Sequence, residues 1–131
     1  MARPYAPLDH ASIAVGDLAA ATAFYDAALA PLGLVRAKSA GAAVGYGPGH
    51  PVFWLIERPT ARRAQPGMGL HFCFGALTRA AVDAFHKAAL AHGAADNGAP
   101  GPRPEYHASY YGAFVIDPEG YKLGAVCHGA P

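Results

Sequence analysis

Length, composition and charge restrict the chain to a few classes of protein. Its 131 residues correspond to one domain of common size, and a composition of 53% hydrophobic and 15% charged residues differs from that of a disordered chain. The formal net charge of +1 offers no electrostatic footprint for nucleic acid. The sequence also contains no signal-peptide pattern and no run of about 18 apolar residues. We therefore expect a cytoplasmic protein that binds neither nucleic acid nor membranes.

The first half of the chain is predicted to form a strand, a helix and about three further strands. In residues 9–15, large apolar side chains alternate with His10 and small side chains, which is typical of a strand with one covered face. Asp17 is a favourable N-cap for an alanine-rich helix at 18–30. Residues 34–56 contain β-prone segments separated by glycines, which favours short strands.

A linker rich in proline, glycine and arginine, residues 58–68, leads to a second half with the same order of elements. Prolines flank the arginines of this linker, so we interpret these arginines as a solvated cluster. The segment 97–104 has no counterpart in the first half and is interpreted as a lid over a site or as an ordinary surface loop. The other predicted elements are a strand at 70–75, a helix from 79 to about 91 capped by Thr78, a strand at 109–116, a turn at 117–120 and a strand at 121–128.

The two halves form an internal repeat. The shift that lays His71 on His10 also lays Phe85 on Phe24 without a gap. A single repeat of half the chain is too short for a solenoid, which needs at least three units. The repeat therefore indicates two similar modules within one domain.

The predicted fold is α+β, with two tandem βαβββ modules that form a curved mixed sheet around a concave cavity and carry their helices on the outside. The single domain covers residues 1–131. The first module spans about 7–57, the linker 58–68 and the second module about 69–129. In each opening strand the large apolar side chains must face the following helix, so the histidine of that strand must face away from it.

Two histidines at matched positions suggest a metal site. If the modules pair about a pseudo-twofold axis, His10 and His71 look into one hollow, which is a start toward a site with two histidines and one carboxylate. The alternative is that each is a hydrogen-bonded core histidine. The sequence leaves both interpretations open.

Four segments together resemble the vicinal oxygen chelate superfamily, which includes glyoxalase I, extradiol dioxygenases, fosfomycin resistance enzymes and bleomycin resistance proteins. They are Leu-Asp-His-Ala-Ser-Ile-Ala-Val at 8–15, Ala-Phe-Tyr-Asp-Ala-Ala-Leu-Ala-Pro-Leu-Gly at 23–33, His71 at the start of the second module, and Asp-Pro-Glu-Gly at 117–120. The resemblance covers essentially the whole chain. It is specific for the fold and not for a reaction.

The resemblance implies a divalent metal such as Zn, Mn, Fe, Ni or Mg, held by His10, His71 and a glutamate on the last strand. This chain departs from that pattern, because the glutamate position falls on Gly124. Two imidazoles alone hold a divalent ion weakly, so a metal needs a replacement ligand or does not bind. Candidates for replacement are His128, at the mouth of the cavity, and Glu57, which we interpret instead as a solvated strand end.

The remaining candidates surround the expected cavity. His107 and Tyr111 are the best candidates for acid–base catalysis, and aromatic and imidazole groups are the candidates for substrate binding. Alternation along a strand offers a simpler interpretation, in which one of Tyr110 and Tyr111 lies in the core and the other outside. Three further histidines, at 50, 86 and 92, are expected at the surface. The substrate-binding candidates are Tyr46, Trp54, Tyr110 and His128.

Two functions follow from these features. One is a metal-dependent lyase, isomerase or dioxygenase of the glyoxalase type, acting on a small oxygenated substrate. The other is a metal-free protein of the bleomycin-resistance type, which binds or sequesters a small molecule between aromatic rings. The histidines favour the first function, and the glycine at the carboxylate position favours the second. In either case we expect a homodimer.

Overall fold

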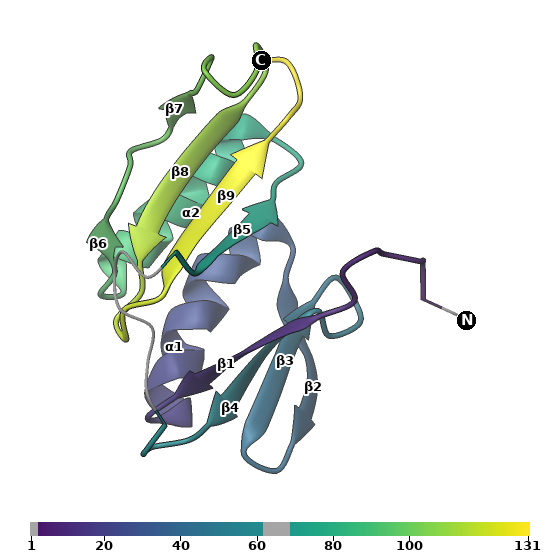
Figure 1. Cartoon of the computed structure of the whole chain (residues 1–131), viewed down its shortest axis with the longest axis vertical. Coiled ribbons are helices and arrows are strands. Elements are labelled where there is room, and N and C mark those ends of the chain that lie inside the picture. The colour runs from purple at the N-terminus through teal and green to yellow at the C-terminus, as the bar shows by residue number, and fades with distance from the viewer. Residues whose placement is uncertain (1–2, 62–68) are drawn as a thin grey trace.

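A computed structural model describes residues 3–61 and 69–131 (Figure 1). The predicted linker lies partly outside these residues, as do its arginines at 62 and 63. The elements follow in the order β1 (Ala11–Val15), α1 (Leu18–Leu29), a 3₁₀ helix (Ala30–Leu32), β2 (Val35–Ala40), β3 (Ala43–Gly47), β4 (Phe53–Glu57), β5 (His71–Gly75), α2 (Arg79–Ala91), β6 (Ala95–Asp96), β7 (Gly101–Pro102), β8 (Tyr111–Ile116) and β9 (Lys122–Cys127).

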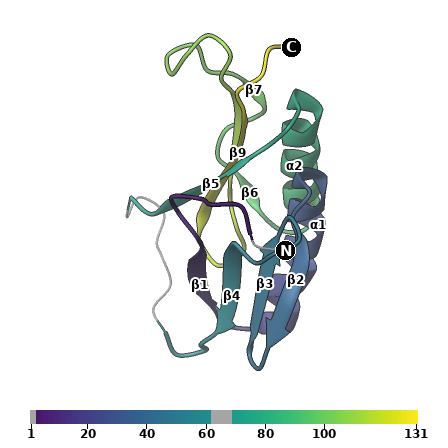
Figure 2. The ribbon, with the colours of Figure 1, turned by 90° about the vertical axis from the view of Figure 1, so that its right-hand side faces the viewer.

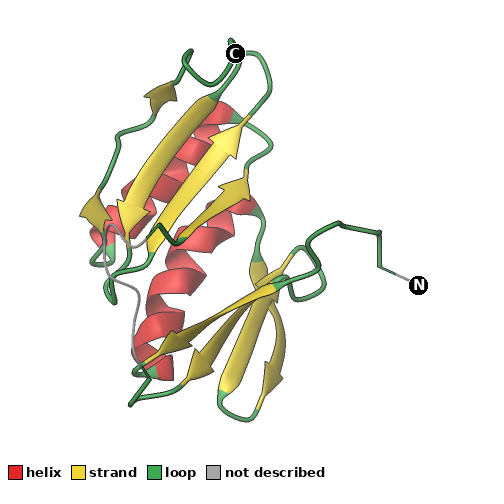
Figure 3. Cartoon of the chain, viewed as in Figure 1, coloured by secondary structure: helices red, strands yellow, loops and turns green. Residues whose placement is uncertain are grey.

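The described strands form two open sheets with matching topology, shown as separate groups of arrows in Figure 3. The first module has the order β1-β4-β3-β2, and the second has β5-β9-β8-β6 with β7 also paired to β8. The first strand of each module runs parallel to the last, β1 to β4 and β5 to β9. The predicted α+β fold of two βαβββ modules is confirmed, with two sheets in place of the one curved sheet expected.

Both helices lie on one side of the sheets. In Figure 1 the sheets stand in front of α1 and α2, and the quarter turn of Figure 2 places both helices on the same side. Each sheet therefore has a helix-covered face and an open face. Side chains alternate along a strand, so the parity of a residue, its odd or even position in the strand, decides which face it occupies.

Side-chain caps set the starts of both helices. The Asp17 carboxylate accepts a hydrogen bond from the Ala20 amide (3.2 Å), and the Thr78 hydroxyl accepts one from the Ala81 amide (3.1 Å). Both caps satisfy amides that have no partner within the helix. After α1 the chain ends its 3₁₀ turn at Gly33, whose φ of 75° lies in the left-handed region that favours glycine.

The segment 97–104, predicted as a lid or a surface loop, is mostly loop and is tied to β8 by hydrogen bonds and by the short strand β7. The Asn97 amide donates to the Phe114 carbonyl (2.9 Å), and the Phe114 amide donates to the Gly98 carbonyl (2.8 Å). Three prolines in the segment lack the amide hydrogen that a continuous ladder needs. The pairing with β8 is therefore split into the short strand β6, just before this segment, and β7 within it.

Aromatic side chains join the two modules on the helix side of the sheets. Phe53 of β4 contacts Tyr25 of α1, with ring centroids 5.6 Å apart. The same ring meets Phe72 and Phe74 of β5 edge to face, at 5.4 and 5.2 Å. Residues from both modules accordingly belong to one hydrophobic cluster.

The turn between β8 and β9 binds the first module through hydrogen bonds. The Tyr25 hydroxyl of α1 donates to the Asp117 carboxylate (2.5 Å), and both groups are buried. The Glu119 carboxylate accepts a hydrogen bond from the Gly16 amide, at 2.9 Å to each oxygen. The Asp-Pro-Glu-Gly motif is therefore a contact between the modules as well as a tight turn.

Replacing Asp26 with asparagine is expected to lower the free energy of unfolding by about 1 kcal/mol at pH 7. Asp26 pairs with Arg36 through two hydrogen bonds (2.8 and 2.6 Å) and accepts one from the buried Tyr46 hydroxyl (2.8 Å). The Arg36 hydrogen bond lowers the pKa of Asp26 below its ordinary 3.8. The loss of stability is modest because this carboxylate is 43% exposed, so water screens the ion pair.

A carboxyl with a lowered pKa stabilises the folded state above its ordinary pKa, and this stabilisation is lost as the pH falls through the lowered value. Urea unfolding of wild type and Asp26→Asn should therefore differ at pH 7 and converge near pH 2. A difference that stays constant over this range would contradict the assignment. The variant keeps an amide oxygen as acceptor for Tyr46, which isolates the contribution of the charge.

Candidate functional site

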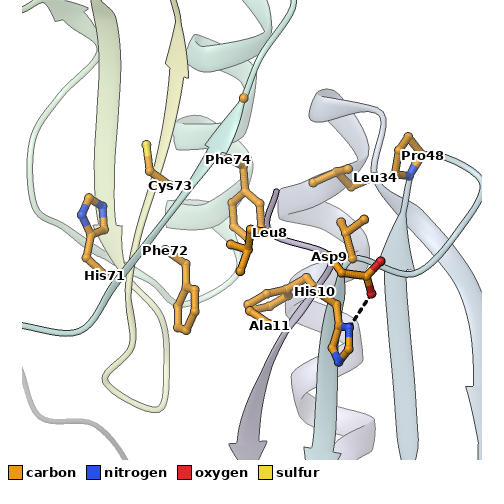
Figure 4. A pocket seen from close by; sticks show the side chains of 13 residues that line it. Leu8, Asp9, His10, Ala11, Leu34, Pro48, His71, Phe72, Cys73 and Phe74 are labelled. Carbon is orange, nitrogen blue, oxygen red and sulfur yellow. Dashed lines mark hydrogen bonds and ion pairs between the residues drawn. The ribbon is translucent and has the colours of Figure 1, made fainter. Parts of the chain in front are cut away.

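A cavity of about 370 Å³ lies between the modules, where the segment entering β1 faces β5 (Figure 4). We call it the inter-module cavity. His10 and His71, the matched histidines of the repeat, both line it, together with the apolar side chains of Leu8, Phe72 and Phe74. The predicted hollow between the modules therefore exists, with one histidine contributed by each module.

The two imidazoles do not point toward one another (Figure 4). His10 is about half exposed, and its Nδ1 shares a hydrogen bond with the Asp9 carboxylate (2.7 Å). His71 lies on the open face of β5, with Phe72 on the other face. Burial, and secondarily the charge of Lys122, lowers the pKa of His71. The neutral form of its imidazole is therefore favoured.

An aromatic ring occupies the space beside Gly124. Strand pairing aligns Gly124 of β9 with Cys73 of β5 on one side and Phe114 of β8 on the other. A Cβ atom built on Gly124 would lie 2.6 and 2.8 Å from two ring carbons of Phe114 and 3.2 Å from the Cys73 sulfur. The place that the family pattern gives to a glutamate is therefore filled by the Phe114 ring.

The donors in the described part of the chain do not fit the three-ligand metal site that the resemblance implies. No group of three or more histidine, cysteine, aspartate or glutamate side chains is placed to hold a metal ion there. Glu57 is engaged elsewhere, because its carboxylate accepts a hydrogen bond from the Leu18 amide (2.9 Å) at the start of α1. It is thus a helix-capping group and not the solvated strand end expected.

A second cavity, of about 480 Å³, lies on the open face of the second module. We call it the second-module cleft. Its aromatic wall includes Tyr106 and Tyr110, whose ring centroids are 4.8 Å apart. His71 lines this cleft as well as the inter-module cavity, so the two spaces share a side chain. The cleft is lined by His71, Asn97, Gly98, Arg103, Glu105, Tyr106, Tyr110, Phe114 and Lys122.

Three predicted site residues, His107, Tyr110 and His128, meet at one end of the second module. The His107 and His128 rings stack with centroids 5.0 Å apart, and Nε2 of His107 lies 2.8 Å from Nδ1 of His128. The Ser109 amide donates to Nδ1 of His107 (3.1 Å). His107 therefore carries its proton on Nε2 and donates it to His128. The Tyr110 ring packs edge to face against both imidazoles.

Two other predicted residues, Tyr46 and Tyr111, lie on the helix side of the sheets. Tyr46 is fully buried, and its hydroxyl donates to Asp26 of α1 (2.8 Å). Tyr111 donates to Asp83 of α2 (2.7 Å), and the Arg79 guanidinium lies over its ring. Neither phenol lines the two cavities, because the parity of its strand places it against a helix. This corrects the positions expected for a substrate-binding Tyr46 and a catalytic Tyr111.

Trp54 lies on the open face of the first module. A Cβ atom built on Gly45 would lie 2.9 Å from the Trp54 indole and 2.6 Å from a carbon of Pro51, so the indole covers this glycine. Trp54 lines neither cavity. The structure therefore does not bring it together with Tyr110 or His128.

The expectation that three histidines lie at the surface is wrong for His86. This side chain of α2 is only 9% exposed and shares a hydrogen bond with the Asp96 carboxylate (2.9 Å). His92 is exposed, as expected. Position on a helix therefore did not by itself indicate exposure.

Sequence reasoning missed Phe114, Arg103 and Lys122 as cleft residues. Phe114 lies on the opposite face of β8 from Tyr111, as alternation along the strand predicts. Its position over Gly124, however, follows only from the register of β8 and β9. Arg103 lies in the segment 97–104, which has no counterpart in the first module. This difference between the halves was the sequence signal that could have indicated a cleft residue there. Lys122 stands two residues before Gly124 and therefore shares its face of β9.

No helix in the described residues is long and apolar enough to cross a membrane.

Comparisons with known proteins place this geometry in a family. The model of the Glyoxalase/Bleomycin resistance protein/Dioxygenase superfamily matches residues 7–124. A glyoxalase/bleomycin resistance protein from Albidiferax ferrireducens T118 is 30% identical, with a TM-score of 0.79 over 91% of this chain and 97% of that chain. A search of curated proteins finds no match.

Two more distant structures share the fold. A glyoxalase/bleomycin resistance protein/dioxygenase family enzyme from Burkholderia phytofirmans PsJN is 22% identical, with a TM-score of 0.71 over 95% of this chain and 100% of that chain. A lactoylglutathione lyase from Agrobacterium tumefaciens is 23% identical, with a TM-score of 0.62 over 95% of each chain. The family model spans most of the chain and agrees with the resemblance drawn from its motifs. The chain belongs to the Glyoxalase/Bleomycin resistance protein/Dioxygenase superfamily.

Proposed function

We propose that the protein binds a small organic ligand on the open face of its second module without a resident divalent metal, as a binding or sequestration protein. The observation that carries the proposal is the Phe114 ring beside Gly124, which takes the space that a carboxylate ligand would need. The rings of Tyr106 and Tyr110 support it, since aromatic walls with a few polar groups are typical of small-molecule sites.

Metal titration of untagged protein tests the proposal. Isothermal titration with Zn²⁺, Ni²⁺, Mn²⁺, Fe²⁺ and Mg²⁺ should show no stoichiometric site that depends on both His10 and His71, because the described residues supply no third donor beside them. His10→Ala and His71→Ala should leave any weak metal uptake unchanged, as should the exposed control His92→Ala. One equivalent of metal bound by wild type and lost in both His10→Ala and His71→Ala would overturn the proposal.

The second candidate function is a metal-dependent lyase, isomerase or dioxygenase. The observation in its favour is that His10 and His71 line one cavity. A ligand from outside the described residues would then have to complete the metal site. His107 is the remaining acid–base candidate, because Tyr111 lies against α2.

The proposal includes a homodimer. Several large apolar side chains are exposed in the single chain, among them Leu8, Val35 and Leu77, which is 97% exposed. A second copy of the chain would cover side chains such as these. Both sheets also have a face without a helix (Figure 2).

A further inference from the structure

We propose that the ligand of the second-module cleft is a planar aromatic carboxylate or a similar small aromatic anion. This inference rests on the proposed function, because it names the ligand class for the same site. It comes from the side chains that line the cleft, which combine aromatic rings with an excess of positive charge.

Aromatic side chains form the apolar part of the cleft. Tyr106, Tyr110 and Phe114 all line it, and the Tyr106 and Tyr110 rings already contact each other at 4.8 Å. Tyr106 remains 62% exposed, so much of its ring is free to contact a ligand. A flat ring offers the contact area and edge-to-face geometry that such a wall favours.

Two cations line the same cleft. The Arg103 guanidinium is held by the backbone, donating to the Gly101 carbonyl (2.9 Å) and the Ala99 carbonyl (2.8 Å), and it lies 5.7 Å from the Phe114 ring centroid. Because carbonyls are neutral, these bonds fix the position of the positive charge without cancelling it. Arg103 therefore supplies a preorganised positive field.

Lys122 brings the second charge to the floor of the cleft. It pairs with His71 across β5 and β9, and its charge contributes to the lowered pKa of His71. In the described part of the chain, neither Lys122 nor Arg103 forms an ion pair with a carboxylate. Among the lining residues the opposing charge comes from Glu105. The lining therefore keeps a net positive charge, which favours an anion over a neutral or cationic ring.

Three matched ligands separate the contributions of ring and charge. 2-Naphthoate is an aromatic anion, 2-naphthamide is its neutral analogue, and cyclohexanecarboxylate is an anion without an aromatic ring. Each is titrated into the full chain in buffer that contains EDTA, and the dissociation constants are compared. We expect 2-naphthoate to bind about tenfold more tightly than either of the other two.

Variants of exposed or half-buried residues locate the binding. Lys122→Gln should weaken 2-naphthoate about fivefold and leave 2-naphthamide unchanged, and Glu105→Gln should strengthen 2-naphthoate by a smaller factor. Tyr106→Ala should weaken both aromatic ligands. Lys87→Gln, on the exposed side of α2, is the matched charge control and should change nothing.

The outcomes distinguish this inference from the proposed function. Equal affinity for 2-naphthoate and 2-naphthamide, or an equal loss in Lys122→Gln and Lys87→Gln, overturns the anion preference and leaves metal-independent binding standing. Equal affinity for cyclohexanecarboxylate overturns the aromatic preference in the same way. Binding of 2-naphthoate that requires added Zn²⁺ overturns both proposals. Absence of binding by all three ligands overturns the inference alone, since the metal titration decides the proposed function.

Discussion

Replacing Asp117 with alanine is expected to lower the free energy of unfolding by about 3 kcal/mol. The Asp117 side chain is 5% exposed and accepts hydrogen bonds from the Tyr25 hydroxyl, the Glu119 amide and the Tyr121 amide. The variant leaves the fully buried Tyr25 hydroxyl without this acceptor and removes the carboxylate that organises the turn. Urea unfolding followed by circular dichroism measures the change.

Two controls separate the contributions to this loss. Asp117→Asn keeps an amide oxygen for the two backbone donors and should cost about 1 kcal/mol, because only the bond with Tyr25 changes character. Asp9→Ala removes a carboxylate that is 67% exposed and should leave the free energy of unfolding nearly unchanged. The assignment fails if Asp117→Ala is as stable as Asp9→Ala.

Replacing Gly124 with alanine is expected to lower the free energy of unfolding by about 2 kcal/mol. The added methyl group would stand 2.6 Å from a Phe114 ring carbon, closer than such atoms approach without displacement. Gly75→Ala is the matched control, because a Cβ atom at Gly75 would meet nothing within 4 Å. That control should be neutral or slightly stabilising, since alanine lowers the entropy of the unfolded chain.

Phe114→Ala should relieve the crowding at Gly124. In a double-mutant cycle, the Gly124→Ala/Phe114→Ala variant is expected to be at least about 1 kcal/mol more stable than the sum of the single changes predicts. Additive losses would show that the ring does not occupy the space beside Gly124. The same result would remove the main support for metal-independent binding.

Local signals were sufficient for most of the fold. The caps at Asp17 and Thr78, the alternation around His10 and the internal repeat predicted elements that the structure contains. The segment 97–104 was harder, because its prolines indicate a loop and its pairing with β8 depends on tertiary context.

The candidate site was only partly predictable. Parity placed His10 and His71 on the open side, but no sequence pattern gives the distance or direction between side chains of different modules. The sequence did not decide the faces of Tyr46 and Tyr111, because a tyrosine suits either side of a sheet and the acceptors that hold the two hydroxyls come from the helices. Phe114 was missed because its role depends on strand register.

The contact between the β8–β9 turn and the first module has a consequence for folding. Its hydrogen bonds join residues 92 and 103 positions apart in sequence, Tyr25 with Asp117 and Gly16 with Glu119. Contacts of such high sequence separation slow folding, because a large loop must close before they form. During synthesis on the ribosome, α1 therefore lacks these partners until residues 117–119 have emerged, and until then water takes the place of Asp117 as the hydrogen-bond partner of the Tyr25 hydroxyl.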